Sequence, residues 1–168
     1  LSDSHMVIID EIPGDYVTSG SQHVGTRWPV YATSTGKAIL AHLPPTDAAP
    51  LLAQPIRPLT PWTLASGPAL EACLDDIRRD GYAVAAEELE LGFVAVGAPL
   101  LDAAGRPIAA ISLGGTSARL TDAQVPEIGR LVRAAAARIS HRLGYRERET
   151  TDYTDFTDSV SEKSVKSV

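Results

Sequence analysis

The chain has 168 residues and a net charge of −6 at neutral pH, with 44% hydrophobic and 21% charged residues. That length suits one domain with a substantial core, and the composition is typical of a globular protein in water. The acidic balance argues against a nucleic-acid surface within this chain, because such domains are usually basic. The single cysteine, Cys73, excludes an internal disulfide framework and a cysteine-based zinc site. No apolar run could span a membrane and no signal peptide is evident, so we expect a cytoplasmic protein.

The first segment predicts strands. The first residue is Leu rather than Met, and the strand pattern starts almost at once, so we expect a piece of a longer protein. Met6–Ile12 is apolar and β-branched, which favours a strand. Pro13-Gly14-Asp15 then predicts a turn, and Tyr16–Thr18 a short second strand.

A helix start with three hydroxyl groups follows at Thr33-Ser34-Thr35-Gly36-Lys37, before a helical segment that Pro44 and Pro45 end. A phosphate loop would need Gly where Tyr31 stands and Ser or Thr at Ala38, so that motif is excluded. What remains is a helix N-terminus whose N–H groups and hydroxyls can hold a small anion such as a carboxylate. The alternative is that the hydroxyls only cap the helix.

The middle of the chain predicts a loop and then an amphipathic helix. Residues 55–68 are rich in proline, which indicates a loop, and we expect Trp62 to anchor it. Leu70, Cys73, Leu74 and Ile77 recur at helical spacing, and Gly81 ends the helix. Cys73 lies on the apolar face, so we expect an inert thiol.

Two apolar runs, Phe93–Leu101 and Pro107–Leu113, are joined by Asp102-Ala103-Ala104-Gly105 and predict an antiparallel hairpin. Because they carry almost no charge, we expect both faces of the hairpin to be covered.

The paired carboxylates Glu87 and Glu88 precede this hairpin. Adjacent residues of an extended segment point to opposite faces, which disfavours joint acid–base chemistry. No catalytic set surrounds them and the four histidines have no metal-ligand spacing, so we predict structural salt links or helix capping, and neither a catalytic nor a metal site.

The C-terminal part predicts one long helix and a tail. Thr121 and Gln124 form a capping-box pattern, an apolar stripe runs from Val125 to Leu143, and Gly144 stands at the expected C-cap. Beyond Arg146 the sequence is polar without an apolar period, which predicts a disordered tail over residues 146–168. The order of elements indicates an α+β fold with an antiparallel sheet over residues 1–145.

Four segments together resemble the effector-binding domain of IclR-type bacterial transcriptional regulators. They are WPVYATSTGKAILAHLPP, LEACLDDIRRDGYAVAAEE, GFVAVGAPLLDAAGRPIAAISLGG and LVRAAAARISHRLG. The resemblance implies a GAF-like domain that binds a small metabolite without a cofactor and forms homodimers or homotetramers. It also implies that a winged helix-turn-helix, absent here together with the first strand and helix of the sensor domain, contacts DNA.

The resemblance also implies a ligand site. The helix start corresponds to Ser34 and Thr35, and Ser112 keeps the serine of the final strand. Ala85 replaces an acidic residue, Ala95 a cysteine or similar residue, and Gly114 a second serine. The remaining positions, which form the apolar wall or stand where a bulky residue can occur, are Val17, Gly20, Trp28 and Phe93.

These replacements remove polar groups and enlarge the space, which favours a larger, more apolar acid, for instance an aromatic one. In the opposing interpretation Trp28 and Phe93 fill the vacated volume. The leading hypothesis is therefore a carboxylate-sensing and oligomerising domain of a regulator, not an enzyme. The alternatives are a small enzyme on a similar scaffold and a dimerisation module with a vestigial pocket.

Overall fold

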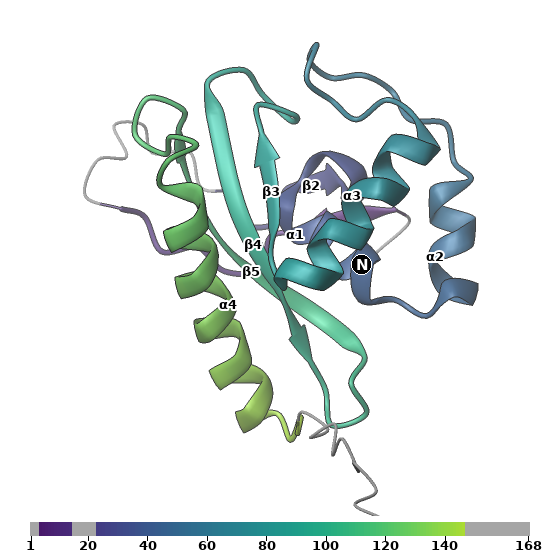
Figure 1. Cartoon of the computed structure of the whole chain (residues 1–168), viewed down its shortest axis with the longest axis vertical. Coiled ribbons are helices and arrows are strands. Elements are labelled where there is room, and N and C mark those ends of the chain that lie inside the picture. Colours follow the sequence, from purple (N-terminus) through teal and green to yellow (C-terminus); the bar gives the residue numbers. More distant parts are fainter. Residues whose placement is uncertain (1–3, 15–22, 147–168) are drawn as a thin grey trace, which may run out of the picture.

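The computed structural model of the chain describes residues 4–14 and 23–146, and it confirms the predicted α+β class. Figure 1 shows helices on either side of a three-stranded sheet, with a pair of short strands beside it. In chain order the elements are β1 (His5–Val7), β2 (Arg27–Pro29), the 3-10 turn η1 (Val30–Ala32), α1 (Ser34–His42), α2 (Pro45–Leu52), α3 (Gly67–Asp80), β3 (Ala83–Ala86), β4 (Phe93–Leu101), β5 (Pro107–Thr116) and α4 (Val125–Arg142).

The larger sheet has the strand order β3-β4-β5, antiparallel throughout. The predicted hairpin is confirmed as β4 and β5. Its turn is held by the Asp102 carboxylate, which accepts hydrogen bonds from the Ala104 and Arg106 N–H groups at 2.9 Å each. Gly105 has a φ of 77°, a conformation that favours glycine, so this residue sets the turn.

Helix α4 covers one face of this sheet. Alternate residues of β4, including Val96 and Ala98, point toward it and are fully buried. From the helix, Val132 and Ala136 pack against Ala98 and its neighbour Leu100. The absence of a side chain at Gly129 allows the ring of Tyr82 to lie directly against the helix.

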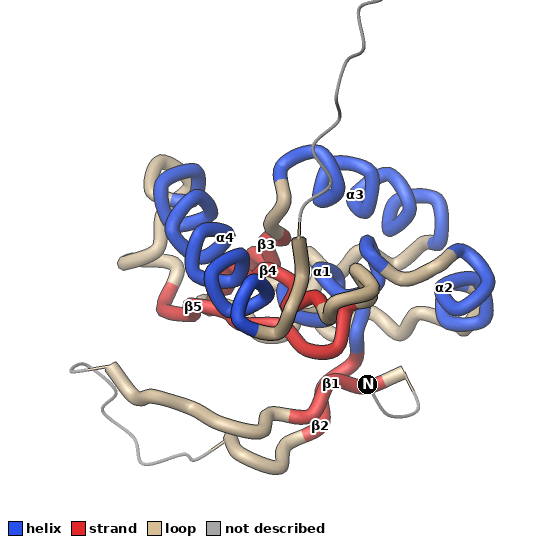
Figure 2. The backbone as a smooth tube through the Cα atoms, turned by 90° about the horizontal axis from the view of Figure 1, so that it is seen from below, coloured by secondary structure: helices blue, strands red, loops and turns tan. Residues whose placement is uncertain are grey.

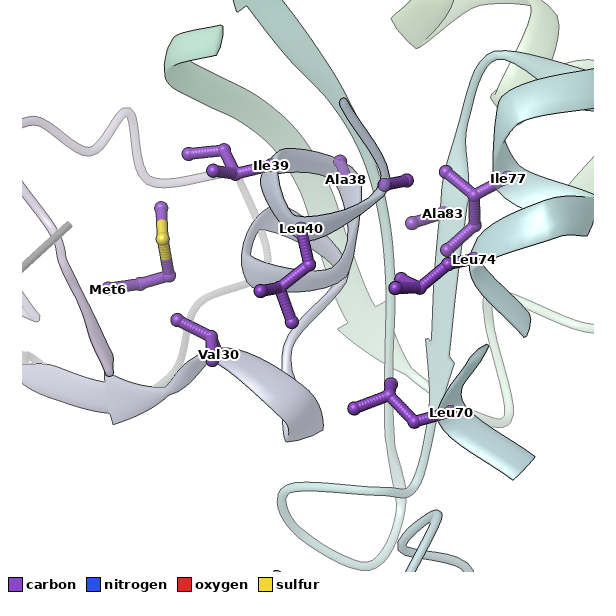
Figure 3. Close-up of a cluster of buried hydrophobic side chains, with 10 residues drawn as sticks. Met6, Val30, Ala38, Ile39, Leu40, Leu70, Leu74, Ile77 and Ala83 are labelled. Carbon is purple, nitrogen blue, oxygen red and sulfur yellow. The ribbon is translucent and has the colours of Figure 1, made fainter. Parts of the chain in front are cut away.

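Helix α1 lies against the opposite face and is the most buried helix, with residues 34–41 all buried. Figure 3 shows its side chains between two layers, with Met6 and Val30 on one side and the α3 residues Leu74 and Ile77 on the other. Ser66 caps α3, and Gly81 ends it with a φ of 76°, as the sequence predicts. The sheet therefore lies between α1 and α4.

The N-terminal strand is shorter than predicted, because β1 ends at Val7 while the sequence favours a strand to Ile12. Its partner β2 has only three residues, and among the described residues the backbone-to-backbone hydrogen bonds of this pair continue only to Ile8, which pairs with Gly25 and Thr26. Ile12 is 91% exposed, since the described residues neither pair with it nor cover it. The predicted strand Tyr16–Thr18 lies outside the described residues. Figure 2 shows this arm running below the larger sheet.

The expectation that both faces of the hairpin are covered is wrong for β5. Ser112, Leu113 and Gly114 are exposed, although Val96 and Ala98 on β4 are fully buried. β5 is the edge of the described sheet, so the helices cover it less completely than the central strand. A lack of charge shows that a strand tolerates burial. It does not show that helices or loops of the same chain bury that strand.

The loop of residues 53–66 is anchored by a threonine and not by the predicted Trp62, which is 63% exposed. The Thr63 hydroxyl accepts hydrogen bonds from the N–H groups of Leu59 and Thr60 at 3.0 Å each, and donates to the Glu88 carbonyl at 2.7 Å. A loop of this length has backbone N–H and carbonyl groups to satisfy. A hydroxyl can accept from the first and donate to the second, whereas an indole ring can only donate.

The last helix begins at Val125, with Pro126 in its first turn, and the predicted capping box is only partly formed. The Gln124 side chain accepts from the Thr121 N–H, but no side chain caps the helix itself. Gly144 follows the helix with a φ of 95°. Apart from Arg146, the predicted tail lies outside the described residues. Among the helices of the described part, none is long and apolar enough to cross a membrane.

Candidate functional site

The start of α1 is the first element of the candidate site. The Thr33 hydroxyl accepts a hydrogen bond from the Gly36 N–H at 3.1 Å, so Thr33 is the helix cap. The interpretation that the hydroxyls only cap the helix therefore holds for Thr33. Ser34 and Thr35 are buried, and as the first residues of the helix their N–H groups have no helical carbonyl to bond.

Gly97 on β4 brings this helix start onto the sheet. A Cβ atom at residue 97 would lie 3.0 Å from the Ser34 Oγ and 3.1 Å from the Thr35 nitrogen. Any side chain at this position would push the helix start away by a few tenths of an ångström, so Gly97 allows the close approach of α1 to β4. Across the ladder, Gly97 pairs with Ala83 on β3 and with Ser112 on β5.

The next row of the sheet contains three more of the predicted residues. Ala95 pairs with Ala85 on β3 and with Gly114 on β5. On their strands, Ala95, Ala85 and Gly114 each lie two positions from the residues that pair at Gly97. Both sets of residues therefore lie on the face of the sheet against which α1 packs. The structure thus brings together six predicted residues, which we call the helix–sheet site: Ser34, Thr35, Ala85, Ala95, Ser112 and Gly114.

Phe93 borders this site and fills part of it. The Phe93 Cζ lies 2.5 Å from the point where a Cβ of residue 114 would stand, so the ring takes the place of a side chain at Gly114. Phe93 is also two residues from Ala95 and therefore points to the same face. The sequence left open whether the space is free for a larger acid or is filled by aromatic rings. Beside Gly114, the Phe93 ring fills it.

The other three predicted residues are not placed at the site. Trp28 is half-buried on β2, and its ring lies 5.4 Å from that of His23, centroid to centroid. Val17 and Gly20 lie outside the described residues.

Two hollows are found elsewhere on the molecule. One of about 180 Å³ lies among α1, α2 and α3, where Leu40, Leu51 and Leu70 line it. One of about 200 Å³ lies beside β3, lined by Cys73 and Tyr82 among others. Neither includes a residue of the helix–sheet site, which is open surface at Ser112 and Gly114 in the part of the chain that we describe.

A buried ion pair next to the site is what the sequence reasoning missed. The Lys37 Nζ lies 2.5 Å from the Glu88 Oε1, and the two side chains are 1% and 9% exposed. The other carboxylate oxygen, Oε2, is buried and has no hydrogen-bond partner among the residues that the structure describes. Burial raises the pKa of Glu88, against the opposing effect of the Lys37 charge. The available signal was a lysine within an otherwise apolar helix, GKAILA.

The remaining ionisable groups fit structural roles. The Glu87 carboxylate accepts a hydrogen bond from the Gly92 N–H at 2.8 Å, which is a loop contact rather than a salt link, whereas Glu88 makes a salt link with Lys37. Burial raises the pKa of the half-buried Cys73 thiol, which makes it a poor nucleophile, as expected. Across residues 4–14 and 23–146, no three His, Cys, Asp or Glu side chains gather in a way that could hold a metal ion.

Comparison with known proteins identifies the family. Residues 1–141 match the model of the bacterial transcriptional regulator IclR C-terminal domain. The chain belongs to the IclR family.

Relatives and solved structures agree with this assignment. The HTH-type transcriptional regulator XynR of Escherichia coli is 35% identical over 140 residues, which cover 83% of this chain and 56% of XynR. The crystal structure of Thermotoga maritima IclR has a TM-score of 0.80 and 33% identity, covering 84% of this chain and 58% of that one. This chain thus spans about half the length of the curated relative.

A third comparison concerns a ligand complex. The inducer-binding domain of Acinetobacter PobR, solved as a double mutant with 3-hydroxybenzoic acid, has a TM-score of 0.70 and 29% identity and covers 83% of each chain. The named IclR-family relatives are transcriptional regulators, and the expectation of a regulator domain rather than an enzyme is confirmed on that basis.

Proposed function

We propose that this IclR-family domain senses a small organic acid for a transcriptional regulator and holds copies of that regulator together. The regulator would be cytoplasmic and would contact DNA through a part outside this chain. Binding would need no cofactor, because the interactions available at the helix–sheet site are hydrogen bonds and apolar contacts.

The observation that carries the proposal is the geometry of the α1 N-terminus. Its Ser34 and Thr35 N–H groups lack helical partners, and the positive end of the helix dipole favours a negative group there. Ser112 adds an exposed hydroxyl from the row that includes Gly97, on the same face of the sheet. Helix N-termini of this kind bind carboxylates through backbone donors.

The rest of the site favours an acid whose carboxylate is attached to an apolar group. Ala85, Ala95 and Gly114 offer no side-chain hydrogen bonds, and the Phe93 ring lies beside them. An aromatic acid would place its ring against this surface and its carboxylate at the helix start. The PobR domain was solved with such an acid, 3-hydroxybenzoic acid, which supports testing this class first.

Calorimetric titration with a panel of aromatic and aliphatic carboxylates tests the proposal. For the acid that binds, Ser112→Ala should weaken affinity about ten- to a hundredfold, the usual effect of losing a hydrogen bond to a charged group. Ser34→Ala should cost less, because its backbone N–H remains. Equal affinities in the parent and Ser112→Ala would exclude Ser112 as a ligand.

A substitution on β4 of the helix–sheet site tests where the apolar part of the acid lies. Ala95→Leu adds three carbons in the row that holds Ala85 and Gly114, so it should exclude an aromatic acid while the domain stays folded. Ala104→Leu, in the exposed hairpin turn, is the matched control. Binding by Ala95→Leu as tight as by the parent would show that Phe93 already occupies the space.

A further inference from the structure

The Lys37–Glu88 pair differs from the surface ion pairs of this molecule in its burial. Lys37 is 1% exposed, whereas both partners of the Arg130–Glu127 pair are about 60% exposed. Exposed pairs are screened by water and salt, but a buried charge acts on its neighbours through a medium of low dielectric constant. The charge state of this pair therefore affects groups several ångströms away.

The pair lies next to the proposed acid site. Lys37 follows Ser34 by three residues, so their Cα atoms are about 4.5 Å apart along the helix axis. Glu88 reaches this first turn from the end of β3, where Thr60 and Thr63 bind the carbonyls of Glu87 and Glu88 at 2.7 Å each. The carboxylate is therefore held in place from α1 and from the loop of residues 53–66.

The hydrogen bonding of the pair is incomplete on the glutamate side. One carboxylate oxygen binds the Lys37 ammonium, while the buried Oε2 has no well-formed hydrogen bond to any described residue, although the nearby Ala86 backbone N–H helps to lower the pKa of Glu88. A buried oxygen without a hydrogen bond costs free energy, so this oxygen lowers the stability of the folded domain. Its negative charge also offsets the positive potential that Lys37 would otherwise create at the α1 N-terminus.

We propose that this pair sets the acid affinity of the helix–sheet site, with Lys37 supplying positive potential and Glu88 limiting it. Glu88 then determines specificity through the electric field of its carboxylate, without touching the acid. The inference rests on the proposed function, because it requires a carboxylate at Ser34 and Thr35.

The proposal differs from a purely structural role in the sign of one effect. If the pair only held α1 in place, Glu88→Gln would weaken binding of the acid as it loosened the helix start. If Glu88 limits the potential, Glu88→Gln should bind benzoate about three- to tenfold more tightly, since Lys37 is left uncompensated. Lys37→Met should weaken benzoate binding by a similar factor.

The experiment is a calorimetric titration of the 168-residue chain and its variants with benzoate, and with benzamide as the uncharged analogue. Glu90→Gln is the matched control, because it removes the same charge from an exposed side chain two residues away. We expect the gain for Glu88→Gln to persist at about 0.5 M salt, where any effect of Glu90→Gln is screened. Benzamide binding should not change in either variant.

A measurement on the unmodified chain keeps the proposal testable if Glu88→Gln does not fold. An anion bound near Glu88 disfavours its ionised form, so benzoate binding should take up protons below neutral pH. Titrations in buffers of different ionisation enthalpy measure this uptake. The groups that face the Glu88 carboxylate are Lys37 on α1 and Cys73 on α3, while Asp76 further along α3 is paired with Arg79.

The outcomes separate the two proposals. Tighter benzoate binding by Glu88→Gln, or proton uptake by the parent chain, supports the inference. Parent binding without proton uptake, together with unchanged or weaker binding by a folded Glu88→Gln, overturns the inference and leaves the proposed function standing. If the parent chain binds neither benzoate nor any acid of the panel, the proposed function fails, and the inference fails with it.

Discussion

Gly97 is the residue on which the geometry of the helix–sheet site depends. Gly97→Ala would place a methyl group 3.0 Å from the Ser34 Oγ and 3.1 Å from the Thr35 nitrogen, so α1 must move. We expect a loss of about 1–3 kcal/mol in the free energy of unfolding, as for other overpacked sites, and weaker acid binding. Urea unfolding measures the first effect. Gly115→Ala, which meets nothing within 4 Å, is the control and should leave stability nearly unchanged.

Glu88 should give the domain a pH dependence of stability with a defined sign. Burial raises its pKa above the value of 4.5 for the unfolded chain, so the folded protein binds this proton more tightly than the unfolded one. The resulting stabilisation is present below about pH 4.5 and is lost as the pH rises through the folded-state pKa.

The test compares the parent chain with Glu88→Gln in urea unfolding across this pH range. Relative to the variant, the parent should lose stability as the pH rises. A difference between the two that stays constant with pH would show that Glu88 has an ordinary pKa in the folded protein.

At the residue scale, short segments predict where the site residues lie in the fold. Ser34 and Thr35 lie at a helix start and Ser112 lies on a strand, as expected, while their role in binding stays a prediction. The link between Lys37 and Glu88 joins residues 51 positions apart, and no local pattern carries it. The sequence shows a lysine beside the apolar residues AILA, but it does not show the partner of that lysine.

Among the elements, the loop of residues 53–66 depends on Thr63. Thr63→Val keeps the shape of the side chain but removes hydrogen bonds to Leu59, Thr60 and Glu88. We expect a cost of about 1–3 kcal/mol, because buried backbone groups lose their partner. Thr46→Val, at an exposed position on α2, is the control. A loss of less than about 0.5 kcal/mol, the usual size of a surface substitution, would contradict the role of Thr63 as the anchor.

Elements held by local contacts were predicted well, and those held by distant partners were not. The β4–β5 hairpin was found because turn residues join its two strands directly. β1 was predicted too long and β2 was not predicted, since each is defined by pairing with the other across about twenty residues of chain. Burial of β5 was overestimated because the cover of a sheet face comes from elements elsewhere.

For the whole molecule, the free edge of β5 leads us to predict self-association. β5 has ten residues without a charge, and Ile108 and Leu113 on it are about half exposed. Uncharged edges of this length pair readily with other strands. Sedimentation at micromolar concentration should show a dimer or tetramer without DNA, and Leu113→Lys should shift it toward monomer. Ala104→Lys, in the exposed turn, should not. A parent chain that sediments as a monomer would contradict this prediction.

The most direct test of acid sensing is a nuclear magnetic resonance titration of the labelled chain with benzoate, following the backbone amide signals. If the acid binds at the helix–sheet site, the signals of Ser34, Thr35 and Ser112 should shift most, since the first two N–H groups are its proposed donors. Shifts centred instead on Leu51, Gln54 and Leu70 would place the acid in the hollow among α1, α2 and α3. That result would contradict the account.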